Sequence, residues 1–176
     1  EARPNKSLVI PSTFQDWQEI IDDNGDNNRI YMGPGEASAD NYYLRDVDWE
    51  SFSIDDRNAY IWGDELFSTG GFNEYEYLYR SVYNANLILE TISKIKSNDV
   101  SQADWDNLQG SALFFRARAF HLLVTTFAKA YDSSTADTDL GIPLRLTTDF
   151  NITSIRANIG QSYNQIIKDL AESIPL

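Results

Sequence analysis

The residues best suited to binding chemistry lie in one stretch, where aromatic rings stand beside hydrogen-bonding side chains. Aromatic rings can stack on the faces of sugars, and carboxylate, amide and guanidinium groups can hydrogen-bond to hydroxyls. The alternative stays open for each ring, which could instead cap the end of a helix or pack into an interface or the core. The candidate ligand-binding residues are Asp40, Asn41, Tyr42, Tyr43, Arg45 and Trp62.

Catalytic chemistry has few residues to work with. His121 is the only histidine and the chain has no cysteine, so Ser–His or Cys–His pairs and the usual zinc sites are disfavoured. Asp22, Asn24 and Asp26 alternate like the start of an EF-hand loop, but Asn27 stands where that loop needs glycine. Carboxylate pairs for glycoside hydrolysis are uninformative among 27 acidic residues. We expect no enzyme activity, no metal and no cofactor.

Charge excludes one further class of protein. The net charge is −13, whereas nucleic-acid binders need clustered lysine and arginine to neutralise phosphates. The longest uncharged runs are too short or too polar to span a bilayer. We therefore expect one globular domain over residues 1–176 that does not bind nucleic acid.

Two long segments, 104–131 and about 74–96, have the periodicity of amphipathic helices. The short turn at 97–101 makes them an antiparallel pair. Asn86 and Arg116 fall inside the apolar faces, so we expect both to be structural polar groups with partners, because an unpaired buried charge is very unfavourable. The predicted core face of the first helix comprises Tyr75, Leu78, Val82, Ala85, Leu89 and Ile92.

Shorter elements complete the predicted architecture. The similar sequences YNANLILETI (83–92) and YNQIIKDLAESI (163–174) suggest stacked helical hairpins. The last helix has a broad apolar face whose natural partner would be a following helix. Residues 24–72 and 132–157 are predicted to be long, mostly irregular loops. The remaining predictions are a helix from Ser12 capped through Gln15, a short helix at 53–60, an extended segment at 140–144 and a helix from Asn158 capped through Gln161.

Four stretches of the sequence stand out as motifs in a fixed order. They are RPNKSLVIPST (3–13), GPGEASADNYYL (33–44), LYRSVYNANLILETI (78–92) and GSALFFRARAFHLL (110–123). Together they resemble the SusD/RagB-like nutrient-binding outer-membrane lipoproteins, with the family's asparagine at Asn86. The last helix, from Tyr163, also resembles the family's next helix. One departure is Ser111, which replaces the glutamate usual in that family's Gly-Glu-Ala-Leu signature.

The resemblance implies an all-α, tetratricopeptide-like scaffold of stacked helical hairpins with long irregular loops. It implies a surface-exposed, lipid-anchored outer-membrane protein that binds glycan, oligosaccharide or peptide nutrients and passes them to a SusC-like TonB-dependent transporter. Family members are much longer, so residues 1–176 are expected to be the N-terminal part of such a protein. The alternatives are an intracellular tetratricopeptide-type adaptor that binds peptides and a carbohydrate-active enzyme.

Overall fold

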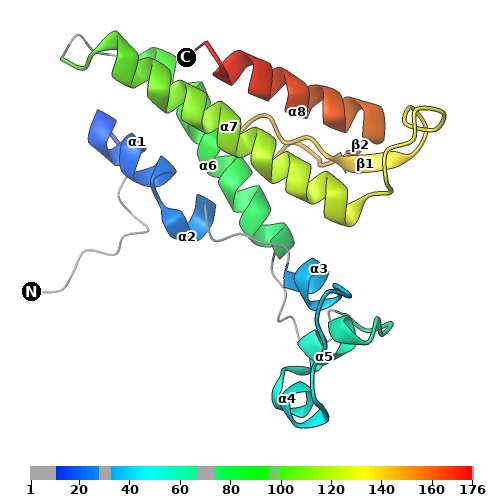
Figure 1. Cartoon of the computed structure of the whole chain (residues 1–176). Coiled ribbons are helices and arrows are strands. Elements are labelled where there is room, and N and C mark those ends of the chain that lie inside the picture. Colours follow the sequence, from blue (N-terminus) through cyan, green and yellow to red (C-terminus); the bar gives the residue numbers. More distant parts are fainter. Residues whose placement is uncertain (1–10, 28–32, 67–73, 96, 98, 176) are drawn as a thin grey trace, which may run out of the picture.

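The computed structural model describes residues 11–27, 33–66, 74–95, 97 and 99–175, and helices dominate these parts of the chain. Figure 1 shows α6, α7 and α8 lying side by side, with α3, α4 and α5 grouped beyond one end of α6. In chain order the elements are α1 (Phe14–Ile21), α2 (Asn24–Asn27), α3 (Gly33–Ala37), α4 (Asp46–Ser51), α5 (Ile54–Tyr60), α6 (Glu74–Ile95), α7 (Gln102–Phe127), β1 (Leu140–Pro143), β2 (Arg156–Asn158) and α8 (Ile159–Ser173).

Helix α7 is the central element of the core. It packs against α6 on one side and α8 on the other, so apolar residues cover more of its circumference than they do on a surface helix. Its N-terminal half also contacts α1. One buried cluster joins α6, α7, β1 and α8 through Leu78, Val82, Phe120, Leu123, Ile142 and Ile166, and a second joins α1, α6 and α7 through Trp17, Ile21, Ile88, Trp105 and Leu108.

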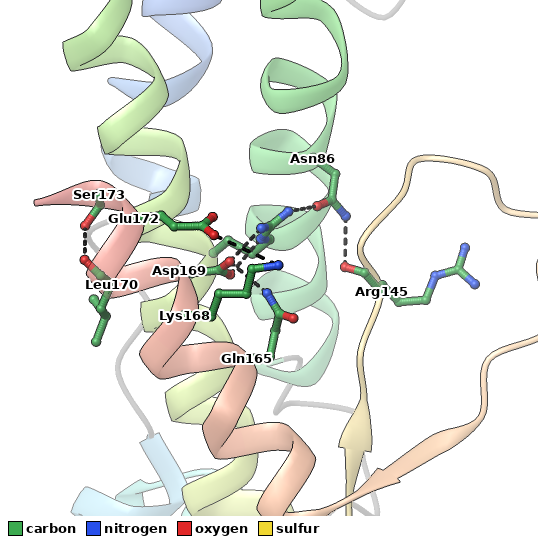
Figure 2. Close-up of polar contacts among 9 residues, drawn as sticks. Asn86, Arg145, Gln165, Lys168, Asp169, Leu170, Glu172 and Ser173 are labelled. Carbon is green, nitrogen blue, oxygen red and sulfur yellow. Dashed lines mark hydrogen bonds and ion pairs between the residues drawn. The ribbon is translucent and has the colours of Figure 1, made fainter. Parts of the chain in front are cut away.

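Arg116 lies buried inside this three-helix core with partners from both neighbouring helices. Figure 2 labels these partners, Asn86 on α6 and Asp169 on α8. Its Nε and Nη2 donate to the two carboxylate oxygens of Asp169 on α8, at 2.8 and 2.7 Å. Its Nη1 donates to Asn86 Oδ1 on α6 at 2.9 Å. Asn86 Nδ2 in turn donates to the Arg145 carbonyl at 2.9 Å, and Gln165 Nε2 donates to Asp169 at 2.8 Å. Arg116 and Asn86 thus point inward and have partners, and that their role is structural and not in ligand binding stays a prediction.

The extended segment predicted at 140–144 is β1, which pairs antiparallel with β2 just before α8. Gly141 allows β1 to approach the start of α8 closely, because an added Cβ would lie 2.7 Å from the Asn158 carbonyl oxygen and would clash with Ser162 Oγ. Arg156 Nε also donates to the Gly141 carbonyl at 2.7 Å. The hairpin therefore fixes where the chain re-enters the helical core.

Helix α7 ends earlier than predicted. The sequence pattern continues to Tyr131, but the helix ends at Phe127 and Ala128 is extended, with φ −126° and ψ 171°. Lys129 Nζ instead pairs with Asp139 at 2.6 Å. The residues after Phe127 thus turn toward β1, and tertiary contacts override the helical periodicity.

Of the two predicted capping boxes, one was right and one was wrong. Asn158 with Gln161 forms the capping box of α8, as predicted. Ser53 caps the short helix α5. The box of α1 is Thr13 with Asp16, one residue later than predicted, because the Asp16 carboxylate accepts the backbone N–H groups of Ser12 and Thr13, each at 2.9 Å. These bonds lower the pKa of Asp16.

Two further predictions about loops need correction or a limit. The region 24–72, predicted to be mostly irregular, also forms the short helices α2, α3 and α4. Residues 1–10, which hold most of the first family-like stretch, lie outside the described residues.

The buried Arg116–Asp169 pair should be essential for stability. We expect Asp169→Ala to lower the free energy of unfolding by about 3–5 kcal/mol, because Arg116 would keep its buried charge without a counter-ion. Glu172→Ala is the matched control on the same helix, since Glu172 faces solvent and lies 4.0 Å from Lys168; it should change stability by less than about 0.5 kcal/mol. Urea denaturation measures both, and equal effects would contradict the prediction.

Candidate ligand-binding site

Helices α3 and α5 form the frame that carries most of the predicted binding residues. At the start of α5, Ser53 Oγ accepts the Asp56 N–H at 3.1 Å. The two helices pack together, and the Tyr60 hydroxyl accepts the Leu44 N–H at 3.0 Å. This contact ties the segment between α3 and α4, which includes residues 40–45, to the end of α5.

Trp62 occupies a backbone conformation that tryptophan seldom adopts. Its φ of 56° lies in the left-handed region, where a non-glycine residue costs roughly 1–2 kcal/mol. The residue closes α5 in a Schellman turn: Gly63 N donates to Asn58 O at 2.7 Å, and Trp62 N donates to Ala59 O at 3.2 Å. Glycine usually takes this position. Strained residues of this kind cluster at functional sites, and Trp62 is 77% exposed.

Two hydrogen bonds hold Tyr42 and Trp62 at the C-terminal end of α3. Trp62 Nε1 donates to Ser38 O at 2.9 Å, and the Tyr42 hydroxyl donates to the preceding carbonyl, Ala37 O, at 2.6 Å. The Tyr42 ring lies 5.7 Å from the Tyr60 ring, centroid to centroid. A hollow of about 350 Å³ opens beside Trp62 and Ser38. The structure therefore gathers these two predicted residues and anchors them through their polar atoms.

The other predicted residues are accessible but less constrained. Tyr43 is 82% exposed, and Asp40 and Asn41 also face solvent. Arg45 is bound to Asp48 through Nε and Nη2, at 2.7 and 3.0 Å, which raises the pKa of Arg45. Its guanidinium would have to leave Asp48 to reach a ligand. None of the three predicted rings is fully buried, so a surface role is physically possible, and contact with a ligand stays a prediction.

The segment that carries these rings is strongly acidic. Between Gly33 and Leu66 the sequence has nine carboxylate residues and two arginines. Such a local field repels anions and favours neutral or cationic partners. An acidic polysaccharide is therefore a poor candidate for this surface, whereas a neutral glycan meets no such penalty.

A second concavity, missed by sequence reasoning, lies between α6 and the segment that follows β1. It has a volume of about 510 Å³, and its lining includes Tyr75, Tyr79 and Tyr83. Tyr75 was predicted to be in the core, but its ring is exposed, edge-on to Phe127 at 5.2 Å. Tyr79 turns inward and donates to Pro143 O at 2.8 Å, and burial raises the pKa of Tyr79. The sequence pattern that could have revealed this groove is the tyrosine at every fourth position of one helix, because such residues lie on the same face.

The opposite wall of this groove is the loop that follows β1, and hydrogen bonds from both backbone and side-chain groups hold it in place. Arg145 donates to the carbonyls of Asp149 and Ile152 within the loop. The Glu90 carboxylate on α6 accepts the Thr148 N–H at 2.9 Å and the Thr148 hydroxyl at 2.6 Å. These bonds, the hydroxyl first, lower the pKa of Glu90. The loop is thus held against α6 in one conformation.

Comparison with known proteins decides the family. The whole chain, residues 1–176, matches the SusD-like family described as starch-binding and associating with the outer membrane. The chain belongs to the SusD-like family. The resemblance carried by the four sequence stretches is confirmed. No curated protein sequence matches the chain at a significant level.

Solved structures show the same fold for this SusD-like chain. A SusD-like carbohydrate binding protein from Bacteroides vulgatus ATCC 8482 aligns with a TM-score of 0.68 at 16% identity, over 94% of this chain and 36% of that one. A putative sugar binding protein from the same organism gives 0.68 at 20% identity, over 96% and 38%. A SusD superfamily protein from Bacteroides thetaiotaomicron VPI-5482 gives 0.61 at 15% identity, over 93% and 37%.

The comparisons also show which part of a SusD-like protein this chain corresponds to in length. The tetratricopeptide-like helical fold predicted for the chain is confirmed, and the chain spans just over a third of the length of these solved structures. Within the described parts of the SusD-like chain, no helix is both long and apolar enough to cross a membrane. The family itself is associated with the outer membrane.

The Glu90–Thr148 contact makes loop anchoring depend on pH. Because the pKa of Glu90 is lowered in the folded protein, the ionised carboxylate stabilises the folded state. This stabilisation is complete above the usual glutamate pKa and is lost as the pH falls through the lowered pKa. In a ¹³C NMR titration of the Glu90 carboxyl, we expect a midpoint below the usual glutamate range. In Thr148→Val, which removes the hydroxyl donor, the midpoint should return toward that range. An ordinary midpoint in the unaltered protein would contradict the prediction.

Proposed function

We propose that this SusD-like chain binds neutral glycans through the exposed rings of Tyr42, Tyr43 and Trp62 beside α3 and α5, with Trp62 at the centre. The main support for this proposal is that Trp62, an exposed tryptophan, is held in a left-handed backbone conformation. The solvated ring contributes one hydrogen bond to the fold, from Nε1 to Ser38 O, and glycine would meet the turn with less strain. Ligand stacking supplies a reason for keeping the ring there.

The geometry supports a sugar rather than an apolar or anionic ligand. Nine carboxylates in the segment disfavour anions, and carboxylates near the rings, such as Asp40, accept hydrogen bonds from hydroxyl groups. The Tyr42 and Trp62 polar atoms are already bonded to Ala37 and Ser38, which leaves the ring faces as the contact surface. Rings fixed before binding lose little conformational freedom when a ligand arrives.

Membership of the SusD-like family suggests a role for the protein in the cell. We propose that the protein acts at the outer-membrane surface, where a lipid anchor would hold it, and delivers bound glycan to a SusC-like TonB-dependent transporter. The family association with the outer membrane favours this role over that of an intracellular tetratricopeptide-type adaptor. We also propose that the chain is not an enzyme. Incubation with a polysaccharide panel should leave the polymers intact, and release of shorter sugars would favour the carbohydrate-active enzyme instead.

Trp62→Gly tests the binding proposal without damaging the fold. Glycine relieves the backbone strain of roughly 1–2 kcal/mol, which offsets the lost Ser38 hydrogen bond, so we expect stability within about 1 kcal/mol of the parent protein. In titration calorimetry with soluble starch, xylan and galactomannan, the polysaccharide that the parent protein binds should bind at least tenfold more weakly, which corresponds to about 1.4 kcal/mol.

Phe52→Ala provides the matched control for this experiment. Phe52 is another exposed ring of the same segment, at the end of α4, and its removal should leave the affinity unchanged. Equal affinity of Trp62→Gly and the parent protein would reject the role of Trp62. Failure of the parent protein to bind any of the three polysaccharides would reject glycan binding by this segment.

A further inference from the structure

We propose that the groove between α6 and residues 143–154 is a second binding site, specific for a neutral, elongated oligosaccharide. It is separate from the Trp62 surface, which is formed by α3, α5 and the segments beside them (Figure 1). The proposal goes beyond the function proposed for that surface, and neither depends on the other.

The groove has an aromatic wall of suitable length. Tyr75, Tyr79 and Tyr83 follow one face of α6, and the first and last are about 12 Å apart along the axis at 1.5 Å per residue. Tyr83 is 47% exposed, and Phe150 on the opposite wall is almost fully exposed. Tyr75 and Tyr83 are half-exposed rings at the two ends of this wall. Two separated stacking faces suit a chain of sugar rings better than a single compact molecule.

The walls are already held in place for binding. Tyr79 is bonded to Pro143 O, Asn86 to Arg145 O, and Glu90 to Thr148. Asn86 also accepts from Arg116, so the buried ion pair of the core extends to the groove wall (Figure 2). A ligand therefore meets a formed surface and does not have to order it, which favours affinity.

The charges on the groove argue for a neutral ligand. Glu76 pairs with Arg80 at 3.0 Å, and the Arg145 guanidinium is bonded to Asp149 O, Ile152 O and Ser154 Oγ. These groups already have partners of their own. A charged ligand would have to break such contacts or bring its own charge into a chain of net charge −13.

A hydroxyl group on the loop supplies the polar complement. Ser154 Oγ accepts from Arg145 at 3.3 Å. Because this oxygen acts as an acceptor in that bond, its O–H group can donate to a ligand oxygen. A purely apolar ligand would cover this donor without pairing it, which disfavours such a ligand. A sugar chain offers both the apolar face and the oxygen acceptors.

NMR separates the two sites in one sample. The methyl groups of Thr147 and Thr148 report on the groove, and the indole N–H of Trp62 reports on the other surface. The probes are maltohexaose, cellohexaose, mannohexaose and xylohexaose, at about 5 mM, above the roughly 1 mM Kd of a weak open site. We expect at least one probe to shift the two threonine methyl signals in the parent protein and equally in Trp62→Gly.

Tyr83→Ala is the decisive variant, with Tyr77→Ala as its matched control. Tyr77 lies on the same helix with a similar exposed fraction, 43%, and is not part of the groove. Tyr83→Ala should weaken the groove titration at least tenfold, and Tyr77→Ala should leave it unchanged. Equal weakening by both variants would overturn the assignment of the contact to the groove.

The remaining outcomes are also informative. If no probe moves the threonine methyl signals, the groove proposal is wrong, while a shift at the Trp62 indole would still support glycan binding there. A proline-rich decapeptide, which can pack against tyrosine rings, tests the alternative of a peptide ligand. If this peptide shifts the two threonine methyl signals and none of the hexaoses does, the groove is a peptide site and the proposal is likewise overturned.

Discussion

The buried guanidinium of Arg116 is the constraint on which the rest of the structure depends. An arginine in the middle of an apolar helix face must be paired or the fold fails, because desolvating an isolated charge costs several kcal/mol. Asp169 of α8 supplies the bidentate partner and Asn86 of α6 the remaining acceptor. The bidentate geometry permits little sliding, so one side chain sets the positions of three helices. The hydrogen-bond network of Arg116 also extends to the groove wall, because Asn86 donates to the Arg145 carbonyl.

Periodicity predicted most of the scaffold because the long helices are amphipathic over many turns. The pair α6 and α7, the capping box at Asn158 and the extended segment at 140–144 required only local patterns. The need of Arg116 for a partner was also visible, but the identity of that partner was not. Asp169 is 53 residues away and is one of 27 acidic residues, and its role is decided by how α8 packs on α7.

The candidate site was predictable in composition and not in geometry. The rings of Tyr42, Tyr43 and Trp62 could be recognised as candidates for exposure, but not the hydrogen bonds that place two of them on α3. The left-handed position at the end of α5 would be assigned to Gly63 on propensity, and the chain places Trp62 there instead. Tyr75 was misplaced because an aromatic residue at a helical core position can also line a groove.

The two surfaces are stabilised by different kinds of contact. The groove is built on the three-helix core, so its walls share the cooperative stability of the Arg116 network. The Trp62 surface rests on short helices held by individual side-chain hydrogen bonds to α3. Such elements open at lower free energy than a packed core. A scaffold that is difficult to change and a ring-bearing segment that is easy to change would allow ligand preference to vary while the helical framework stays the same.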